Sequence, residues 1–120
     1  KIGLPLVSTY CASKQAVTGY YESLRYEIAK YDINITILSP GFIKTDITKN
    51  SLTADGKVFN KDSIAQEKGM NANLCAKKMI QAIQKGKRHE HIGGLETFMP
   101  AFSFFFPQIF FFLMKKMHKI

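Results

Sequence analysis

The chain has 120 residues, of which 46% are hydrophobic, so it is long enough for one domain with a core and too short for two. Its formal net charge of +8 makes it basic, but the lysines are scattered and form no continuous stripe with interleaved aromatic residues. We therefore expect no nucleic-acid partner. Cys11 and Cys75 lie far apart without a CxxC partner, which indicates reduced thiols facing the cytosol.

A long amphipathic helix is predicted over residues 10–31, because apolar residues recur there at spacings of three and four. Ser8 or Thr9 offers a side-chain oxygen for its N-cap. Tyr10 and Lys14 stand one turn apart and therefore project from the same face. A positive charge near a phenol favours the phenolate, so the pair is a candidate general acid/base. From the spacing alone, an ordinary surface pair is the more common explanation.

A short β-branched run at residues 33–38 is followed by Ser39-Pro40-Gly41, which predicts a buried strand and its exit turn. A helix that leads directly into a buried strand indicates an α/β layer with a parallel sheet. Ligands of such sheets bind beyond the carboxyl ends of the strands, where Pro40 and Gly41 lie.

The polar stretch 44–70 predicts a loop with one short helix, since Ser63 begins a capping-box pattern. Asn71 or Asn73 is expected to cap the next helix, and Gly86 to end it. The apolar positions of that helix repeat at helical spacing, at Ala76, Met79, Ile80 and Ile83.

A last short strand is predicted over residues 89–92. His89 and His91 lack a third ligand, so we expect no metal site.

Residues 98–114 hold most of the phenylalanines and no charge, and lysines close the chain after them. As one helix this stretch would reach only about 25 Å, and Pro100, Pro107 and Gln108 interrupt it. A kinked segment in a membrane interface fits better than a clean span. A hydrophobic flap over a substrate site and a partner-binding segment stay open as alternatives.

Tyr10-Cys11-Ala12-Ser13-Lys14 resembles the Tyr-x-x-x-Lys signature of the short-chain dehydrogenase/reductase family. Residues 23–27 and the Pro40-Gly41 turn with Thr45 follow at the spacing typical of that family. The resemblance covers residues 1 to about 93. The lead-in and the phenylalanine-rich tail are most similar to its membrane-associated member 7 group.

This resemblance implies an α/β fold that is the C-terminal part of a Rossmann-like three-layer fold with a parallel sheet, incomplete in this chain. A domain over residues 1–97 would be followed by an apolar tail over 98–120. It also implies an oxidoreductase that interconverts an alcohol and a ketone or aldehyde with NADP or NAD, NADP being slightly favoured. The substrate is expected to be lipophilic.

The resemblance assigns roles to single residues. Tyr10 would give or take the proton, and Lys14 would assist it and bind the nicotinamide ribose. The cofactor-binding residues would be Tyr10, Lys14, Pro40, Gly41, Ile43 and Thr45. The helix over residues 10–31 would form a homodimer contact, and residues 98–114 a membrane contact. We expect location at the endoplasmic reticulum membrane facing the cytosol, or otherwise in the cytoplasm.

Two features of the family pattern are missing from the sequence: the glycine-rich phosphate turn and a serine about a dozen residues before Tyr10. Ser8 stands at the wrong spacing. We therefore expect this fragment to be inactive by itself. The alternative function is a non-catalytic membrane-associated scaffold or binding protein with the same fold.

Overall fold

The structure, a computed structural model, describes residues 2–53, 55–59 and 64–118. It contains two compact units, each described here by itself. One comprises residues 1–37 and 98–120, and the other residues 38–97. The predicted division into a domain over 1–97 and a tail over 98–120 stays a prediction.

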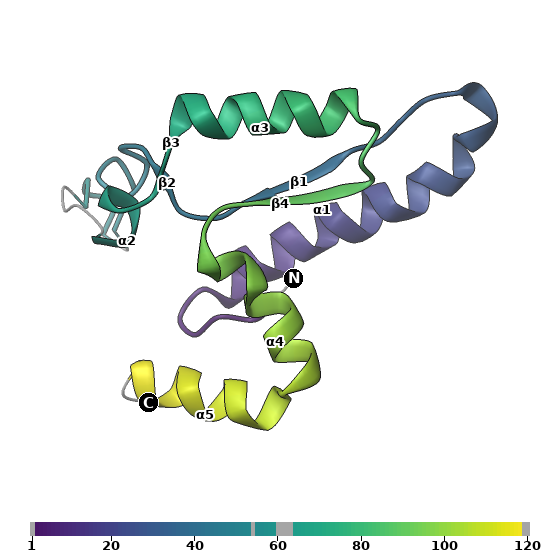
Figure 1. The fold of residues 1–120 in the computed structure, drawn as a ribbon. Coiled ribbons are helices and arrows are strands. Elements are labelled where there is room, and N and C mark those ends of the chain that lie inside the picture. Colours follow the sequence, from purple (N-terminus) through teal and green to yellow (C-terminus); the bar gives the residue numbers. More distant parts are fainter. Residues whose placement is uncertain (1, 54, 60–63, 119–120) are drawn as a thin grey trace. The chain divides into compact units, whose positions relative to one another are not determined.

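The fold is α/β, as the sequence predicts, with helices and short parallel strands (Figure 1). The elements follow in the order α1 (Ser8–Glu27), η1 (Ala29–Tyr31), β1 (Ile37–Pro40), β2 (Ile43–Lys44), α2 (Ile64–Glu67), β3 (Met70–Asn71), α3 (Ala72–Gln84), β4 (His89–Ile92), η2 (Leu95–Phe98), α4 (Met99–Phe105) and α5 (Pro107–Met117).

Helix α1 confirms the predicted long helix, but its first turn differs from the prediction. The N-cap is Val7, which gives no side-chain hydrogen bond, so the prediction of a Ser8 or Thr9 cap is wrong. Instead, the Cys11 N–H donates to the Val7 carbonyl at 2.9 Å. The last turn tightens into η1, and Asp32 ends it with a φ of 55°.

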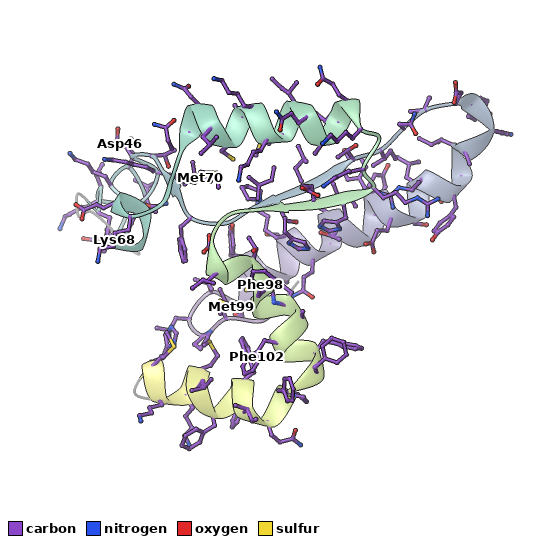
Figure 2. The ribbon with its side chains drawn as sticks, viewed as in Figure 1. Asp46, Lys68, Met70, Phe98, Met99 and Phe102 are labelled. Carbon is purple, nitrogen blue, oxygen red and sulfur yellow. The ribbon has the colours of Figure 1, made fainter. Side chains whose placement is uncertain are left out.

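The tail forms two helices, as expected for a kinked segment. Helix α4 ends at Phe105 with Phe106 as its C-cap, and Pro107 opens α5, where its missing N–H and fixed φ are tolerated. Phe102 of α4, labelled in Figure 2, has its ring centroid 5.6 Å from that of Phe106 and 6.4 Å from that of Phe110. These contacts hold the two helices together around Phe110, which is buried.

Among its described residues, the second unit holds two sheets of two strands each. In one sheet β1 pairs with β4, and in the other β2 runs parallel to β3 with Ile43 opposite Met70. Figure 1 shows β1 and β4 side by side and running in the same direction.

The predicted strand bounds of 33–38 are wrong, because β1 begins only at Ile37. Ile33 is exposed, and Arg25 of α1 donates to the Ile35 carbonyl at 3.1 Å in place of a strand partner. Since β1 has one partner strand in its sheet, Ile37, Leu38 and Ser39 are half-buried rather than buried, and Pro40 is exposed.

Helix α3 covers the predicted range, but a different face of it is buried. Cys75 and Ala82 are buried, whereas Ile80 and Ile83 are more than half exposed. The repeat of apolar residues thus predicts the helix itself, and the buried face is not centred on those positions. The helix ends at Gln84, and Gly86 follows its C-cap Lys85 with a φ of 60°, as predicted for the residue that stops the helix.

Asn71 is the N-cap of α3, and its side-chain oxygen accepts from the Asn73 N–H at 2.9 Å and from the Leu74 N–H at 3.3 Å. Asn71→Ala is expected to lower the free energy of unfolding by about 1 kcal/mol, because two amides of the first turn lose their acceptor. Urea denaturation measures the loss. Asn73→Ala is the matched control, since only its backbone takes part, and an equal loss in both variants would contradict the cap.

Candidate active site

The predicted catalytic pair lies in the first two turns of α1. The Lys14 ammonium is 5.7 Å from the centroid of the Tyr10 ring. The backbone of both residues is fixed by the helix, and two hydroxyls bind its carbonyls: Ser13 Oγ donates to the Tyr10 carbonyl at 2.8 Å, and Thr18 Oγ1 to the Lys14 carbonyl at 3.2 Å. Tyr10 is 60% exposed, so its hydroxyl is within reach of a ligand.

The same helix region ends with a second lysine and tyrosine. The Lys30 ammonium lies 4.9 Å from the centroid of the Tyr31 ring in η1. Proximity of an ammonium to a phenol ring is therefore not special to Tyr10 and Lys14. The Lys30 and Tyr31 pair serves as an internal control for every claim about the first pair.

The predicted cofactor segment runs from the end of β1 into β2. Pro40 is the last residue of β1, Ile43 lies in β2, and Thr45 follows that strand as an exposed side chain. Gly41 connects the two strands, and its N–H donates to the Ile92 carbonyl at the end of β4 at 2.8 Å. The segment from Pro40 to Thr45 thus follows the carboxyl end of a strand, as the sequence predicts.

A carboxylate that the sequence analysis did not single out lies against this turn. Glu96 Oε1 accepts from the Phe42 N–H at 3.1 Å and from the Gly94 N–H at 3.0 Å. The hydrogen bond from Gly94, more than that from Phe42, holds the pKa of this carboxyl below its usual value, although partial burial opposes the shift. The sequence carries no local signal for this contact, because Phe42 and Glu96 are 54 positions apart.

Next to Glu96 lies a cavity of about 430 Å³, lined by Phe42, Lys68, Gly69, Met70, Gly93, Gly94 and Glu96. Figure 2 labels Lys68 beside α2 and Met70 in β3. Backbone amides and one ammonium therefore surround this cavity together with the carboxylate of Glu96.

Each unit holds part of the residues that the resemblance assigns to a nicotinamide cofactor, Tyr10 and Lys14 in the first and Pro40 to Thr45 in the second. An exposed phenol with a nearby ammonium can exchange a proton with a carbonyl or alcohol oxygen and bind ribose hydroxyls. A Cβ at Gly41 would need space on one side of the Pro40-Gly41 turn. At Gly41 that space is taken by the end of the Glu96 side chain, which is flexible.

A separate apolar groove of about 920 Å³ lies in the first unit. Its lining residues are Gly3, Leu4, Pro5, Ser8, Cys11, Ala12, Gln15, Ser103, Phe110, Phe111, Met114 and Lys115. The α1 residues among them are at i, i+3, i+4 and i+7, and this face is turned by more than about 100° from Tyr10 and Lys14. The groove therefore borders the candidate catalytic helix on another face.

The α/β fold and the Tyr10-x-x-x-Lys14 spacing on its first helix are the features on which the resemblance to the short-chain dehydrogenase/reductase family rests, and sequence comparison tests that resemblance. The family model described as short chain dehydrogenase matches residues 1–56. The chain belongs to the short-chain dehydrogenase/reductase family.

Several curated relatives come from the member 7 group. A Bos taurus dehydrogenase/reductase SDR family member 7B is 35% identical over 73% of this chain and 27% of its own length. The SDR family protein 7-like of Drosophila melanogaster is 36% identical over 69% of this chain and 26% of its own. That of Anopheles gambiae is 31% identical over 97% of this chain, tail included, and 37% of its own.

This chain thus spans roughly a quarter to a little over a third of the length of these relatives. The comparison with solved structures found no match.

Proposed function

We propose that the full-length protein is an NAD(P)-dependent oxidoreductase that interconverts an alcohol and a ketone or aldehyde. The observation that carries this proposal is the exposed Tyr10 phenol with the Lys14 ammonium one turn away, in a chain of the short-chain dehydrogenase/reductase family. NADP is slightly favoured over NAD by the resemblance to the member 7 group.

In this proposal Tyr10 donates its proton to the carbonyl oxygen during reduction and accepts it back during oxidation. The ammonium of Lys14 stabilises the negative charge that forms on the phenol oxygen, and it also donates to the nicotinamide ribose. Pro40, Gly41, Ile43 and Thr45 bind the nicotinamide end. When bound, the cofactor supplies or accepts the hydride.

A lipophilic substrate is supported by the groove in the first unit. Its walls are mostly aliphatic and aromatic, from Leu4, Phe110, Phe111 and Met114, and Lys115 brings one positive charge to its edge. Burial of an apolar chain in such a groove is favourable in proportion to the apolar area covered. Because Tyr10 is on another face of α1, the groove suits an apolar extension of the ligand rather than its reacting carbonyl.

Membrane contact through residues 98–114 is part of the proposal. Helix α5 is apolar on two faces: Phe110 and Met114 line the groove, whereas Ile109, Phe112 and Leu113 are exposed. An exposed aromatic face followed by Lys115 and Lys116 suits the headgroup region of a membrane. Within the described residues, none of the helices is both long enough and apolar enough to cross a membrane. We propose the endoplasmic reticulum, facing the cytosol, as its place.

The exposed residues of α1 support a homodimer contact through this helix. Val17, Tyr20 and Tyr21 are each at least 43% exposed, and the rings of Tyr20 and Tyr21 meet edge to face at 5.2 Å. Large exposed apolar side chains on one helix are typical of subunit interfaces.

Lys14→Met in the full-length protein tests the proposed function. It is expected to lower kcat at least tenfold, because the charge that assists proton transfer is lost while the methylene stem is kept. Steady-state oxidation of the reduced cofactor with a panel of apolar ketones measures the effect. Lys30→Met is the matched control, since it removes the same charge beside Tyr31 and should leave kcat unchanged. Equal turnover in wild type and Lys14→Met would contradict the role of Lys14, and no turnover in wild type would favour the non-catalytic scaffold.

A further inference from the structure

Three hydrogen bonds hold the backbone at the exit of β1. The Gly41 N–H donates to the Ile92 carbonyl at 2.8 Å, and the Met70 N–H donates to the Phe42 carbonyl at 2.9 Å. The Phe42 N–H, in contrast, has a side chain as its acceptor, Glu96 Oε1 at 3.1 Å. The position of the Gly41-Phe42 peptide therefore depends on one carboxylate as well as on backbone pairing.

Glycines make the space for this carboxylate. A Cβ added at Gly41 would stand 2.1 Å from Glu96 Oε1, one at Gly93 would stand 2.5 Å from it, and one at Gly94 would stand 2.9 Å from Oε2. All three distances are shorter than a non-bonded carbon–oxygen contact allows. Any side chain at these positions would displace the Glu96 carboxylate from the two amides that it binds.

The carboxylate binds as an anion. Both the Phe42 and the Gly94 N–H donate to the same oxygen, Oε1, and hydrogen bonds to an ionised acceptor are stronger than neutral ones. The pKa of Glu96 is held below the usual 4.5 by these donors, chiefly that from Gly94. The two hydrogen bonds to an ionised Glu96 are therefore fully present above pH 4.5, and they are lost as the pH falls through the lowered pKa. Lys68 is the other charged side chain that lines the neighbouring cavity.

We propose that Glu96 is a positioning residue. Its carboxylate ties the turn after β1 to the turn after β4 and thereby fixes the Gly41-Phe42 peptide, which lies between the proposed cofactor contacts at Pro40 and Ile43. That Glu96 influences cofactor binding rests on the proposed function. That Glu96 holds the Phe42 and Gly94 amides does not depend on it.

Hydrogen exchange of the Phe42 and Gly94 amides in the full-length protein tests the link itself. Glu96→Ala is expected to raise exchange at both amides on the order of tenfold, because both lose their acceptor. Glu96→Gln keeps an oxygen that can take the place of Oε1, so it should restore most of the protection. Glu90→Ala is the matched control, because this carboxylate on β4 pairs with Lys87 at 2.7 Å and binds neither amide. Unchanged exchange in Glu96→Ala would overturn the proposal.

Gly41→Ala gives a second, independent variant. Its methyl group would displace the Glu96 carboxylate, so exchange at Phe42 should rise as it does in Glu96→Ala, and the double variant Gly41→Ala/Glu96→Ala should be no worse than either single variant. Additive effects would contradict a shared cause.

The pH dependence of an amide resonance distinguishes an ionised Glu96 carboxylate from a side chain that only packs against the turn. The Phe42 amide resonance is expected to begin to shift in wild type as the pH falls below 4.5 and to stay constant over the same range in Glu96→Gln. A constant resonance in wild type would overturn an ionic link.

The Kd for the nucleotide tests whether the hydrogen bonds of Glu96 matter for cofactor binding. Glu96→Ala should raise the Kd for NADP(H) or NAD(H) roughly tenfold, and Glu96→Gln by less. Faster amide exchange at unchanged affinity would overturn the positioning role. A wild-type protein that binds neither nucleotide would contradict the proposed function instead, and the exchange results would still stand.

Discussion

Tyr10→Phe in the full-length protein is expected to lower kcat by roughly 10²- to 10⁴-fold, the range that a positioned general acid/base contributes. The substitution removes one oxygen and keeps the ring, so α1 and the ring contact with Lys14 should persist. Cofactor affinity is expected to change little, because Lys14 and the segment from Pro40 to Thr45 remain. Steady-state kinetics together with a nucleotide-binding titration measure the two effects separately.

Tyr26→Phe is the matched control. Tyr26 lies on the same helix and is 76% exposed, so loss of its hydroxyl should leave both kcat and stability unchanged. If the Tyr10 and Tyr26 variants retain equal turnover, the assignment of Tyr10 as the proton donor is wrong.

Gly69→Ala is expected to lower the free energy of unfolding by about 1–3 kcal/mol or more, as overpacking of a rigid site does. The added Cβ would stand 2.6 Å from the Phe42 carbonyl oxygen and 2.9 Å from that of Gln66. Both oxygens belong to the backbone and accept hydrogen bonds, from the Met70 and Gly69 amides respectively. Unlike at Gly41, no flexible side chain can move away, so the pairing of β2 with β3 has to shift.

The control is Gly19→Ala, because nothing lies within 4 Å of a Cβ there and Gly19 is inside α1. Alanine in a helix interior is favoured over glycine by about 0.5–1 kcal/mol, so this variant should be slightly more stable than wild type. Urea denaturation of both variants gives the comparison. A Gly69→Ala protein as stable as Gly19→Ala would contradict the close approach of backbone at Gly69.

Local patterns in the sequence predict much of the fold. The apolar period gives α1, Asn71 gives the start of α3, Gly86 gives its end, and the run before Gly93 gives β4. These features depend on residues close together in the chain. The tail likewise divides where Pro107 interrupts it.

Errors arise where distant contacts decide the outcome. The first residues of the run 33–38 have strand propensity, but β1 forms only where β4 supplies a partner, and that partner is some 50 residues away. The buried face of α3 is likewise set by what packs against it, so Cys75 and Ala82 are covered while Ile80 and Ile83 are not.

The residues of the candidate site likewise divide into those whose positions follow from the local sequence and those that depend on distant contacts. Tyr10 and Lys14 are predictable because one helical turn separates them, and Pro40 and Gly41 because a strand must end there. Glu96 is not, since its partner amide at Phe42 lies 54 positions earlier in the chain.

A single-turnover experiment can follow the hydride and test whether its transfer requires the Tyr10 hydroxyl. The full-length protein is mixed with NADPH or NADH deuterated at C4 and with a lipophilic ketone, and deuterium in the alcohol product is measured by mass spectrometry in a single turnover. Wild type is expected to place deuterium on the carbonyl carbon, and Tyr10→Phe to do so at least a hundredfold more slowly. Deuterium transfer by Tyr10→Phe at the wild-type rate would contradict the account.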